Sequence, residues 1–438
     1  MKVLKFGGTS VGSPQRMKDV AKLITDGERK IVVLSAMSGT TNTLVEISDY
    51  LHKKNPDGAN EVINRLENKY KQHINELFST EEYRQKGMEL LKVRFELLRS
   101  YTKDLFTLFE ERIVLAQGEL LSTTMVNYYL QEQGVKSVLL PALDFMRTDK
   151  NAEPDLPYIK ERLAQQLEAN PDAEIYITQG FICRNAYGEV DNLQRGGSDY
   201  SASLIGAAVK ADEIQIWTDI DGMHNNDPRI VDKTSPVRHL HFEEAAELAY
   251  FGAKILHPTC IQPAKYANIP VRLLNTMDPK AEGTMISNET EKGKINALAA
   301  KENITPIKIK SSRMLLAHGF LRKVFEIFEK YQTSIDMICT SEVGVSVSID
   351  NTKHLNEILD ELRKYGTVTV DHNMCIICVV GDLEWENVGF EAKALDAMRD
   401  IPVRMISYGG SNYNISVLVR ECDKKAALQS LSDQLFNN

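Results

Sequence analysis

The first fourteen residues place the strictest constraint on how this chain folds. Residues 3–6 alternate like a short buried strand, and Gly7-Gly8-Thr9-Ser10 follows at once. Ser13 and Pro14 then mark a helix start, with serine as N-cap and proline at the first helical position. A strand that runs through a glycine turn into a helix exposes backbone N–H groups beside a positive helix dipole, which suits a phosphate. Lys5 would add a cation there, although a tight turn with a solvated lysine fits this stretch equally well.

The composition excludes several classes of protein. The chain has 438 residues, enough for two or three domains with cores of their own, and 43% of them are hydrophobic. A formal net charge of -9 argues against nucleic acid or an anionic membrane as the main partner. No apolar run approaches the length of a bilayer span and no signal peptide is evident, so we expect a cytoplasmic protein.

Cysteine and histidine spacing gives no sign of a metal site. Six cysteines over this length do not form a disulfide framework. Cys375 and Cys378 lie in an apolar stretch that reads as a strand, so their sulfurs should point to opposite faces. His239 and His241 could share a strand face, but no third ligand stands near them in sequence. We interpret all four as structural.

Short β-branched runs alternate with helical stretches over the first two thirds of the chain. Besides 3–6, the expected strands are 31–34, 137–140, 174–178, 213–217 and 271–274. This alternation predicts a mainly parallel sheet covered on both faces, with ligands at the carboxyl ends of the strands. Polar and glycine-rich segments do follow these runs, at 35–42, 180–181 and 218–229.

Two further regions differ from this alternation. Residues 51–130 have helical spacing and predict long helices, and Gln117-Gly118-Glu119 interrupts the pattern near a helix start and offers one carboxylate. After the polar linker 288–294, a weak repeat of about 70 residues predicts two small α/β modules, a regulatory region. A single α+β domain that serves only dimerisation is the alternative.

Three later segments support a site at the predicted sheet edge. In Arg195-Gly-Gly-Ser-Asp199, the arginine suits a carboxylate, and Asp199 either pairs with Lys5 or caps a helix. The loop 218–229 ends in Arg229 and could cradle a nucleotide. In 251–258, Lys254 follows a glycine and could reach phosphates, although a lone lysine there is usually solvated.

Taken together, these motifs closely resemble the aspartokinase branch of the amino-acid kinase family. The matching segments are K-F-G-G-T-S at 5–10, S-A-x-x-x-T-T-N at 35–42, G-E at 118–119, R-G-G-S-D at 195–199, W-T-D-x-D-G at 217–222, D-P-R at 227–229 and G-A-K-x-L-H-P at 252–258. The tail resembles the paired ACT modules of that family. The resemblance implies an α/β fold. Residues 1–296 would form an amino-acid-kinase-like sandwich with a mainly parallel central sheet. Residues 297–438 would form tandem ACT-like α+β regulatory modules, at about 305–370 and 371–438.

The resemblance also implies an activity and a role for each matching residue. The activity is ATP-dependent phosphorylation of the side-chain carboxylate of L-aspartate, with Mg²⁺ held mainly by the nucleotide phosphates. Phosphoryl transfer to a carboxylate needs positioning and charge neutralisation, and no general base, because the nucleophile is already ionised. The implied catalytic residues are Lys5, assisted by the Gly7 and Gly8 amides, and Asp199, which orients Lys5. The implied aspartate-binding residues are Ser35, Ala36, Thr41, Glu119 for the ammonium, Arg195 for the α-carboxylate, and Ser198; the implied ATP contacts are Lys5, Gly7, Gly8, Thr218, Asp219, His224, Arg229 and Lys254.

The chain departs from the family pattern at two positions. The family often has an aromatic residue where His224 stands, and often has glycine where Gln194 stands. Neither departure removes a charged catalytic group, so we expect activity, with a possible change in nucleotide affinity.

The first tail module resembles the effector site of lysine-inhibited aspartokinases. Its matching residues are Met314, Phe320, Leu321, Ser334, Ile335, Asp336, Thr340, Ser341 and Glu342. The carboxylates of Asp336 and Glu342 suit a cationic side chain, and Phe320 and Met314 could cover its methylenes. We therefore hypothesise feedback inhibition by L-lysine; the alternative is that Asp336 caps a turn and Glu342 is solvated.

Two other functions remain as rivals. Another amino-acid kinase, acting on glutamate, carbamate or a nucleotide, would share most of the motifs, and a non-catalytic amino-acid sensor would share the fold. Arg195 and Glu119 favour a free α-amino acid, and the intact Lys5 and Asp199 favour catalysis. We expect a monofunctional enzyme without a fused homoserine dehydrogenase, and a homodimer formed through the ACT-like region, because such modules bury their sheet edges by pairing.

Overall fold

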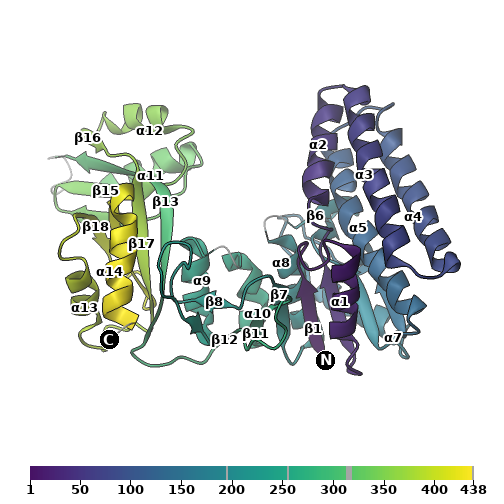
Figure 1. The fold of residues 1–438 in the computed structure, drawn as a ribbon. Helices are drawn as coiled ribbons and strands as arrows, with labels where there is room; N and C mark the ends of the chain where they lie inside the picture. The colour runs from purple at the N-terminus through teal and green to yellow at the C-terminus, as the bar shows by residue number, and fades with distance from the viewer. Residues whose placement is uncertain (194–195, 254–255, 312–317, 437–438) are drawn as a thin grey trace. The chain divides into compact units, whose positions relative to one another are not determined.

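The computed structural model describes residues 1–193, 196–253, 256–311 and 318–436, and they form two compact units. The first unit comprises Met1–Met223 and Leu256–Asn288, and the second comprises His224–Ile255 and Glu289–Asn438 (Figure 1). Residues 224–255 thus belong structurally with the tail, whereas the sequence division at 296 assigns them to the kinase domain. That division remains a prediction about sequence domains.

The first unit alternates strands and helices. Its elements are β1 (Lys2–Phe6), α1 (Pro14–Ile24), β2 (Lys30–Leu34), α2 (Thr40–His52), α3 (Pro56–Leu77), α4 (Glu81–Ser100), α5 (Leu108–Glu132), β3 (Ser137–Leu140), α6 (Ala142–Phe145), α7 (Leu156–Glu168), β4 (Ile175–Gln179), β5 (Ile182–Arg184), β6 (Val190–Asn192), α8 (Gly197–Val209), β7 (Ile214–Thr218), α10 (Gln262–Tyr266), β11 (Val271–Asn275) and β12 (Thr284–Ser287). The two-residue strand β8 (Met223–His224) lies at the border between the units.

The strands of this unit form a mainly parallel sheet, as the sequence predicts. Their order is β12-β11-β7-β1-β2-β4-β3, and only the pairing of β12 with β11 is antiparallel among these neighbours. Phe6 is in register with Leu34 on one side and with Trp217 on the other. The carboxyl ends of β1, β2 and β7 therefore meet at one edge, where the glycine turn after Phe6 also lies.

The two faces of β1 carry different side chains. Leu4 and Phe6 belong to a large core that also takes in the buried sides of α1, α2, α3, α4 and α5. Side chains alternate across a strand, so Lys5 points to the opposite face, against which α8 packs. The helices α2 to α5 stand together as a bundle beside the sheet (Figure 1). This arrangement explains why Lys5 meets the start of α8 and not the bundle.

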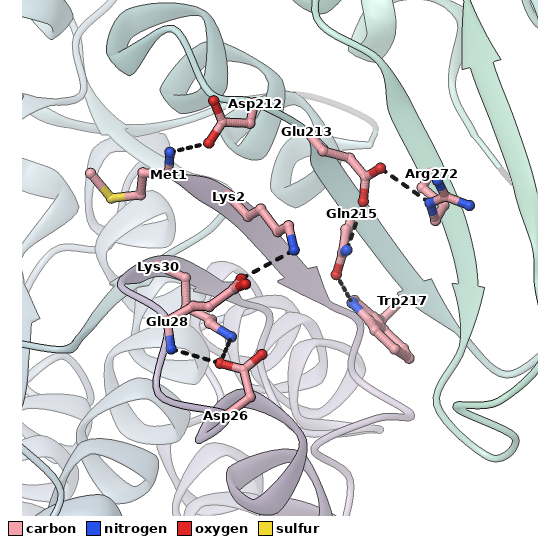
Figure 2. Close-up of polar contacts among 10 residues, drawn as sticks. All are labelled: Met1, Lys2, Asp26, Glu28, Lys30, Asp212, Glu213, Gln215, Trp217 and Arg272. Atoms are coloured by element: carbon pink, nitrogen blue, oxygen red, sulfur yellow. Dashed lines mark hydrogen bonds and ion pairs between the residues drawn. The ribbon is translucent and has the colours of Figure 1, made fainter.

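A network of polar side chains ties the strands together at their amino ends (Figure 2). The ammonium of Met1 pairs with Asp212, and Lys30, whose side chain is 2% exposed, pairs with Asp26. Glu28 accepts from the Lys2 ammonium at 3.1 Å, and Glu213 accepts from the Arg272 guanidinium at the same distance. These pairs connect residues of β1, β2 and β11 with residues beside them at the sheet edge opposite the glycine turn.

The second unit is built around one sheet of seven strands. Its elements are β9 (Pro236–Val237), β10 (His239–His241), α9 (Phe242–Tyr250), β13 (Ile295–Lys310), α11 (Phe320–Lys330), β14 (Ile338–Ser341), β15 (Gly344–Ile349), α12 (Leu355–Leu362), β16 (Thr367–Val370), β17 (Met374–Gly381), α13 (Phe390–Ala397), β18 (Val403–Ser407), β19 (Asn414–Arg420) and α14 (Lys424–Phe436). The strand order is β14-β15-β13-β17-β19-β18, with β16 also pairing with β13.

The long strand β13 belongs to both halves of this unit. Its first part, from Ile295 to Ile304, pairs with β17, and its last part, from Thr305 to Lys310, pairs with β15. An irregularity between Lys301 and Ile304 separates the two parts. The predicted modules therefore share one continuous strand, and the second module takes its first strand from residues that precede the first module in the chain.

Each half of the unit has a core of its own. Ile307, Phe320 and Val324 belong to one core, and Leu298, Ile377 and Leu428 belong to the other. Val231, 1% exposed, is buried in the second core, which explains why the segment after β7 clusters with the tail.

Three of the four cysteines and histidines singled out in the sequence have packing roles, and the fourth, His239, is exposed in β10. Cys375 and Cys378 are free and buried in β17, with Cys375 in the second of these cores. His241 caps α9 and stacks on Tyr413, with ring centroids 5.0 Å apart. Among the helices of the described ranges, none is long and apolar enough to cross a membrane.

Candidate active site

A pocket of about 720 Å³ opens at the carboxyl edge of the first unit's sheet. Segments that follow β1, β2 and β4, the start of α8 and the middle of α5 surround it. Its lining residues are Lys5, Gly8, Thr9, Ser35, Ala36, Met37, Ser38, Gly39, Thr41, Asn42, Glu119, Phe181, Gly196, Gly197, Ser198 and Asp199. Most of the residues predicted to bind substrate within this unit therefore share one cavity.

Lys5 and Asp199 form an ion pair in this pocket. The Lys5 ammonium lies 2.7 Å from Oδ1 of Asp199, and the two side chains are 11% and 13% exposed. The buried strand β1 holds the lysine stem, so the ammonium position is set by packing as well as by charge. The alternative role of Asp199 as a helix cap is wrong, because α8 has Gly196 as its N-cap and Asp199 stands in the first turn.

The start of α8 directs backbone N–H groups at the pocket. The first amides of a helix have no intrahelical acceptor, and here they belong to the pocket residues Gly197, Ser198 and Asp199. Gly196 adopts φ +73°, and a Cβ on it would lie 2.4 Å from Sγ of Cys260. A Cβ on Gly197 would lie 2.6 Å from the ring of Phe181. The two glycines are therefore required for close packing, and the helix start that they form has the free N–H groups that suit an anion.

Glu119 offers a buried carboxylate with one unused oxygen. Its Oε1 accepts from the Ala36 amide at 3.2 Å, whereas Oε2 is buried and has no hydrogen-bond partner. Burial raises the pKa of this carboxyl to about 7. The hydrogen bond from the Ala36 amide lowers the pKa, but by less than burial raises it. A buried carboxylate in this state is suited to an incoming cationic group.

The sequence interpretation of the segment around Glu119 was wrong in one respect. Gln117-Gly118-Glu119 does not mark a helix start, because α5 runs unbroken from Leu108 to Glu132. Gly118 is present for close packing: a Cβ on it would lie 2.7 Å from Cβ of Ala36. The glycine thus lets the helix approach the loop after β2, which brings Glu119 within reach of the Ala36 amide.

Hydroxyl groups connect the loop after β2 with α8 and α5. Ser35 donates from its Oγ to Oγ of Ser198 at 2.9 Å, and Ser122 of α5 donates to the Ser35 carbonyl at 2.8 Å. Thr41 lines the pocket from the first turn of α2. The predicted aspartate-binding residues Ser35, Thr41 and Ser198 therefore line the same pocket, and a hydrogen bond joins Ser35 to Ser198.

Sequence reasoning gave no role to several residues of the lining. Met37, Ser38, Gly39 and Asn42 lie within the quoted 35–42 motif, so their presence in the motif was the available signal. Phe181, which follows β4, has φ +69°, unusual for a side chain with a Cβ. Its carbonyl accepts from the Leu193 amide at 2.7 Å, and its ring packs on Gly197, so Phe181 contacts the end of one described stretch and the start of the next.

Comparison with known proteins gives the family. The sequence profile of the amino acid kinase family matches residues 1–275, and that of an ACT domain matches residues 377–435. The chain is 33% identical to lysine-sensitive aspartokinase 3 of Escherichia coli, with 99% of each chain covered. It is 34% identical to the chloroplastic aspartokinase 1 of Arabidopsis thaliana, with 100% of this chain and 80% of that protein covered. The chain belongs to the aspartokinases.

A solved structure agrees with this membership. The crystal structure of E. coli aspartokinase III in complex with aspartate and ADP matches the whole chain with a TM-score of 0.84 at 33% identity, and 100% of each chain is covered. The resemblance stated from the motifs is confirmed, as are the fold class and the assignment as an aspartate kinase that uses ATP.

The ATP-contacting residues expected of an aspartokinase lie in both units. In the first unit, Gly7 and Gly8 follow β1, Thr218 ends β7 and Asp219 follows it, so all four stand at the same sheet edge. In the second unit, Arg229 pairs with Asp227 at 2.7 Å and its side chain is 79% exposed. His224 contacts Thr234 through Nδ1 at 2.9 Å. Lys254 lies outside the described residues, as do Arg195 and Gln194.

The effector residues expected from lysine-sensitive aspartokinases all belong to the second unit. Phe320 begins α11 and is buried in the core that also contains Ile307 and Val324. Ile335 is half-buried, and the exposed residues are Leu321, Ser334, Thr340, Ser341 and Glu342. The Asp336 side chain is 1% exposed and pairs with the Lys301 ammonium at 2.7 Å. This buried ion pair differs from the alternative stated above, in which Asp336 only caps a turn. Met314 lies outside the described residues.

Proposed function

We propose that this aspartokinase binds L-aspartate in the pocket between Lys5, Glu119 and Asp199 and phosphorylates its side-chain carboxylate there. One observation carries the proposal: an oriented ammonium, a helix N-terminus and a buried carboxylate with a free oxygen line the same 720 Å³ cavity. A free amino acid has one group for each of them, because its ammonium suits Glu119 and its carboxylates suit cations and N–H donors.

Lys5 would stabilise the phosphoryl group in transfer. The pair with Asp199 holds its ammonium at the end of β1, next to the Gly7-Gly8 turn, where a Cβ on Gly7 would lie 3.5 Å from that ammonium. A preorganised cation at the site of developing charge lowers the barrier without any reorganisation during the reaction. The aspartate carboxylate is ionised at neutral pH, so the chain needs to position it and does not need to remove a proton.

Glu119 would bind the substrate ammonium and so fix the orientation of aspartate. Its Oε2 is free of other partners, and its Oε1 is held by the Ala36 amide. The ammonium would restore the charge balance that burial disturbs, so substrate binding and ionisation of Glu119 are coupled. Ser35, Ala36, Thr41 and Ser198 would line the remainder of the aspartate site, and Arg195 would hold the α-carboxylate.

Mg²⁺ would enter with the nucleotide. The groups that line the pocket are mostly an ammonium, amides and hydroxyls, a donor set that suits phosphate oxygens better than a metal ion. Bound together with the nucleotide, the metal would neutralise phosphate charge. By the family resemblance, the residues of this chain that would contact the nucleotide are Lys5, Gly7, Gly8, Thr218, Asp219, His224, Arg229 and Lys254.

L-lysine is the effector that we propose. The name of the E. coli relative describes a lysine-sensitive enzyme, and Asp336 and Glu342 give this chain two carboxylates at the corresponding segment. We also propose, from the family resemblance, that the enzyme works in the cytoplasm as a homodimer formed through its ACT-like region.

A coupled assay for ADP release tests the substrate and the effector together. We expect turnover with aspartate, negligible turnover with glutamate, and inhibition of the aspartate reaction by lysine but not by threonine. Faster turnover with glutamate would contradict the substrate assignment. Inhibition by threonine alone would contradict the effector assignment and leave the substrate assignment intact.

A further inference from the structure

Four side chains of the second unit, those of Asp336, Lys301, Asp350 and Tyr250, form a polar cluster. The Lys301 ammonium lies 2.7 Å from Oδ1 of Asp336 and 2.9 Å from Oδ2 of Asp350. The Tyr250 hydroxyl donates to Oδ1 of Asp336 at 3.0 Å, and the Lys301 ammonium lies 4.6 Å from the centre of the Tyr250 ring. Lys301 stands at the irregularity of β13 where the strand passes from one module to the other.

The charges of this cluster do not balance. One ammonium faces two carboxylates. The side chain of Asp336 is 1% exposed, and its Oδ2 has no hydrogen-bond partner. Buried carboxylate oxygens are normally paired, so this oxygen is a place for a second cation. Lys301 can give up Asp336 without losing all of its partners, because Asp350 is 41% exposed and remains available to it.

The cluster is also attached to the end of α9. Tyr250 is the last residue of that helix, and its hydroxyl holds Asp336 directly. Two residues later, Gly252 adopts φ +117°, and a Cβ on it would lie 2.3 Å from the carbonyl oxygen of Ala300, the neighbour of Lys301 in β13. The chain leaving α9 is therefore held against residues 300–301 at two points. The next residues lead to Lys254, one of the proposed ATP contacts.

We propose that Asp336, Lys301, Asp350 and Tyr250 form a relay between the effector site and the nucleotide-contacting segment. A second ammonium group binds Oδ2 of Asp336, Lys301 shifts toward Asp350, and the contact of Tyr250 with Asp336 changes with it. The end of α9 then moves relative to β13. This inference rests on the proposed function in one respect, namely that the effector is an amino acid that carries an ammonium on its side chain.

The test separates binding of the effector from its effect on activity. Tyr250→Phe in the full-length enzyme removes the hydroxyl and keeps the ring, and Tyr266→Phe, at a residue 82% exposed in α10, is the matched control. Calorimetry measures L-lysine binding, and the kinase assay measures inhibition. We expect Tyr250→Phe to bind lysine within about threefold of the parent affinity, while the lysine concentration for half-inhibition rises about tenfold or more. Tyr266→Phe should match the parent in both.

Each other outcome would overturn the relay. An unchanged inhibition curve for Tyr250→Phe would show that its hydroxyl transmits nothing. A parallel loss of binding and inhibition would make Tyr250 a binding residue and not a connection. If the parent phosphorylates aspartate but binds no lysine, the effector proposal and the relay both fail while the catalytic proposal stands.

Discussion

The substitution Glu119→Gln should make the enzyme more stable and less able to bind its substrate. The side chain is 4% exposed, and burial raises its pKa from an ordinary 4.5 to about 7. Each pH unit between these values corresponds to about 1.4 kcal/mol, so ionised Glu119 lowers the stability of the substrate-free protein by about 3 kcal/mol. The neutral amide of glutamine does not carry this cost.

The direction of the pH dependence follows from the raised pKa. Below pH 4.5 the Glu119 carboxyl is protonated in both the folded and the unfolded chain, so it does not change how the free energy of unfolding depends on pH. Between 4.5 and about 7 the folded protein holds a proton that the unfolded chain has released, so this group's contribution to stability falls as pH rises. Substrate binding has the opposite trend, because only the ionised form offers a charge to the aspartate ammonium.

Two measurements on the same variant test this reasoning. Denaturant unfolding at pH 8 without ligand should show Glu119→Gln to be more stable than the parent by about 1–3 kcal/mol, the upper bound being the full ionisation cost. The KM for aspartate should rise about 10- to 150-fold, the loss expected for a charged hydrogen bond of about 1.5–3 kcal/mol. Glu89→Gln, at an exposed position of α4, should change neither. A variant with unchanged KM, or one less stable than the parent at pH 8, would refute the account of Glu119.

Three further substitutions test other parts of the structure. Lys5→Met should lower kcat at least about 100-fold and leave the circular dichroism spectrum unchanged, whereas Lys2→Met on the same strand should retain activity. An equal loss of kcat in both variants would contradict a role specific to Lys5. Gly118→Ala should lower stability by about 1–3 kcal/mol and raise the aspartate KM, because its Cβ would press on Ala36 at 2.7 Å; a stabilised variant would disprove this packing. Asp26→Asn should lower the Tm and leave KM unchanged, because it acts at the far edge of the sheet; a raised KM would argue against that separation.

The sequence was sufficient for the parallel sheet because buried strands of this kind are short, apolar and bounded by glycine. For the turn after β1 it left two interpretations open, an anion site or a tight turn with a solvated lysine, and the buried pair of Lys5 with Asp199 favours the first. The sequence offered the pairing of Lys5 with Asp199 as one of two alternatives. The alternation of β1 explains why the two meet, because Leu4 and Phe6 occupy the helical core and Lys5 faces α8.

Other features depend on contacts that the sequence does not reveal. Gly118 looks like a helix breaker in the chain, and only the approach of Ala36 shows why glycine stands within an unbroken helix. The shared strand β13 is likewise invisible, because a continuous 16-residue strand carries no mark of where its partner changes. The partnership of Asp336 with Lys301 joins residues 35 positions apart across a sheet whose pairing the sequence leaves open.

The central claim is that aspartate lies with its ammonium on Glu119 and its side-chain carboxylate toward Lys5. A crystal structure with L-aspartate and a non-hydrolysable ATP analogue tests it most directly. We predict hydrogen bonding between the ammonium and Oε2 of Glu119, with the γ-phosphate between Lys5 and the reacting carboxylate. Aspartate bound in the reverse orientation, or a γ-phosphate out of reach of Lys5, would contradict the claim.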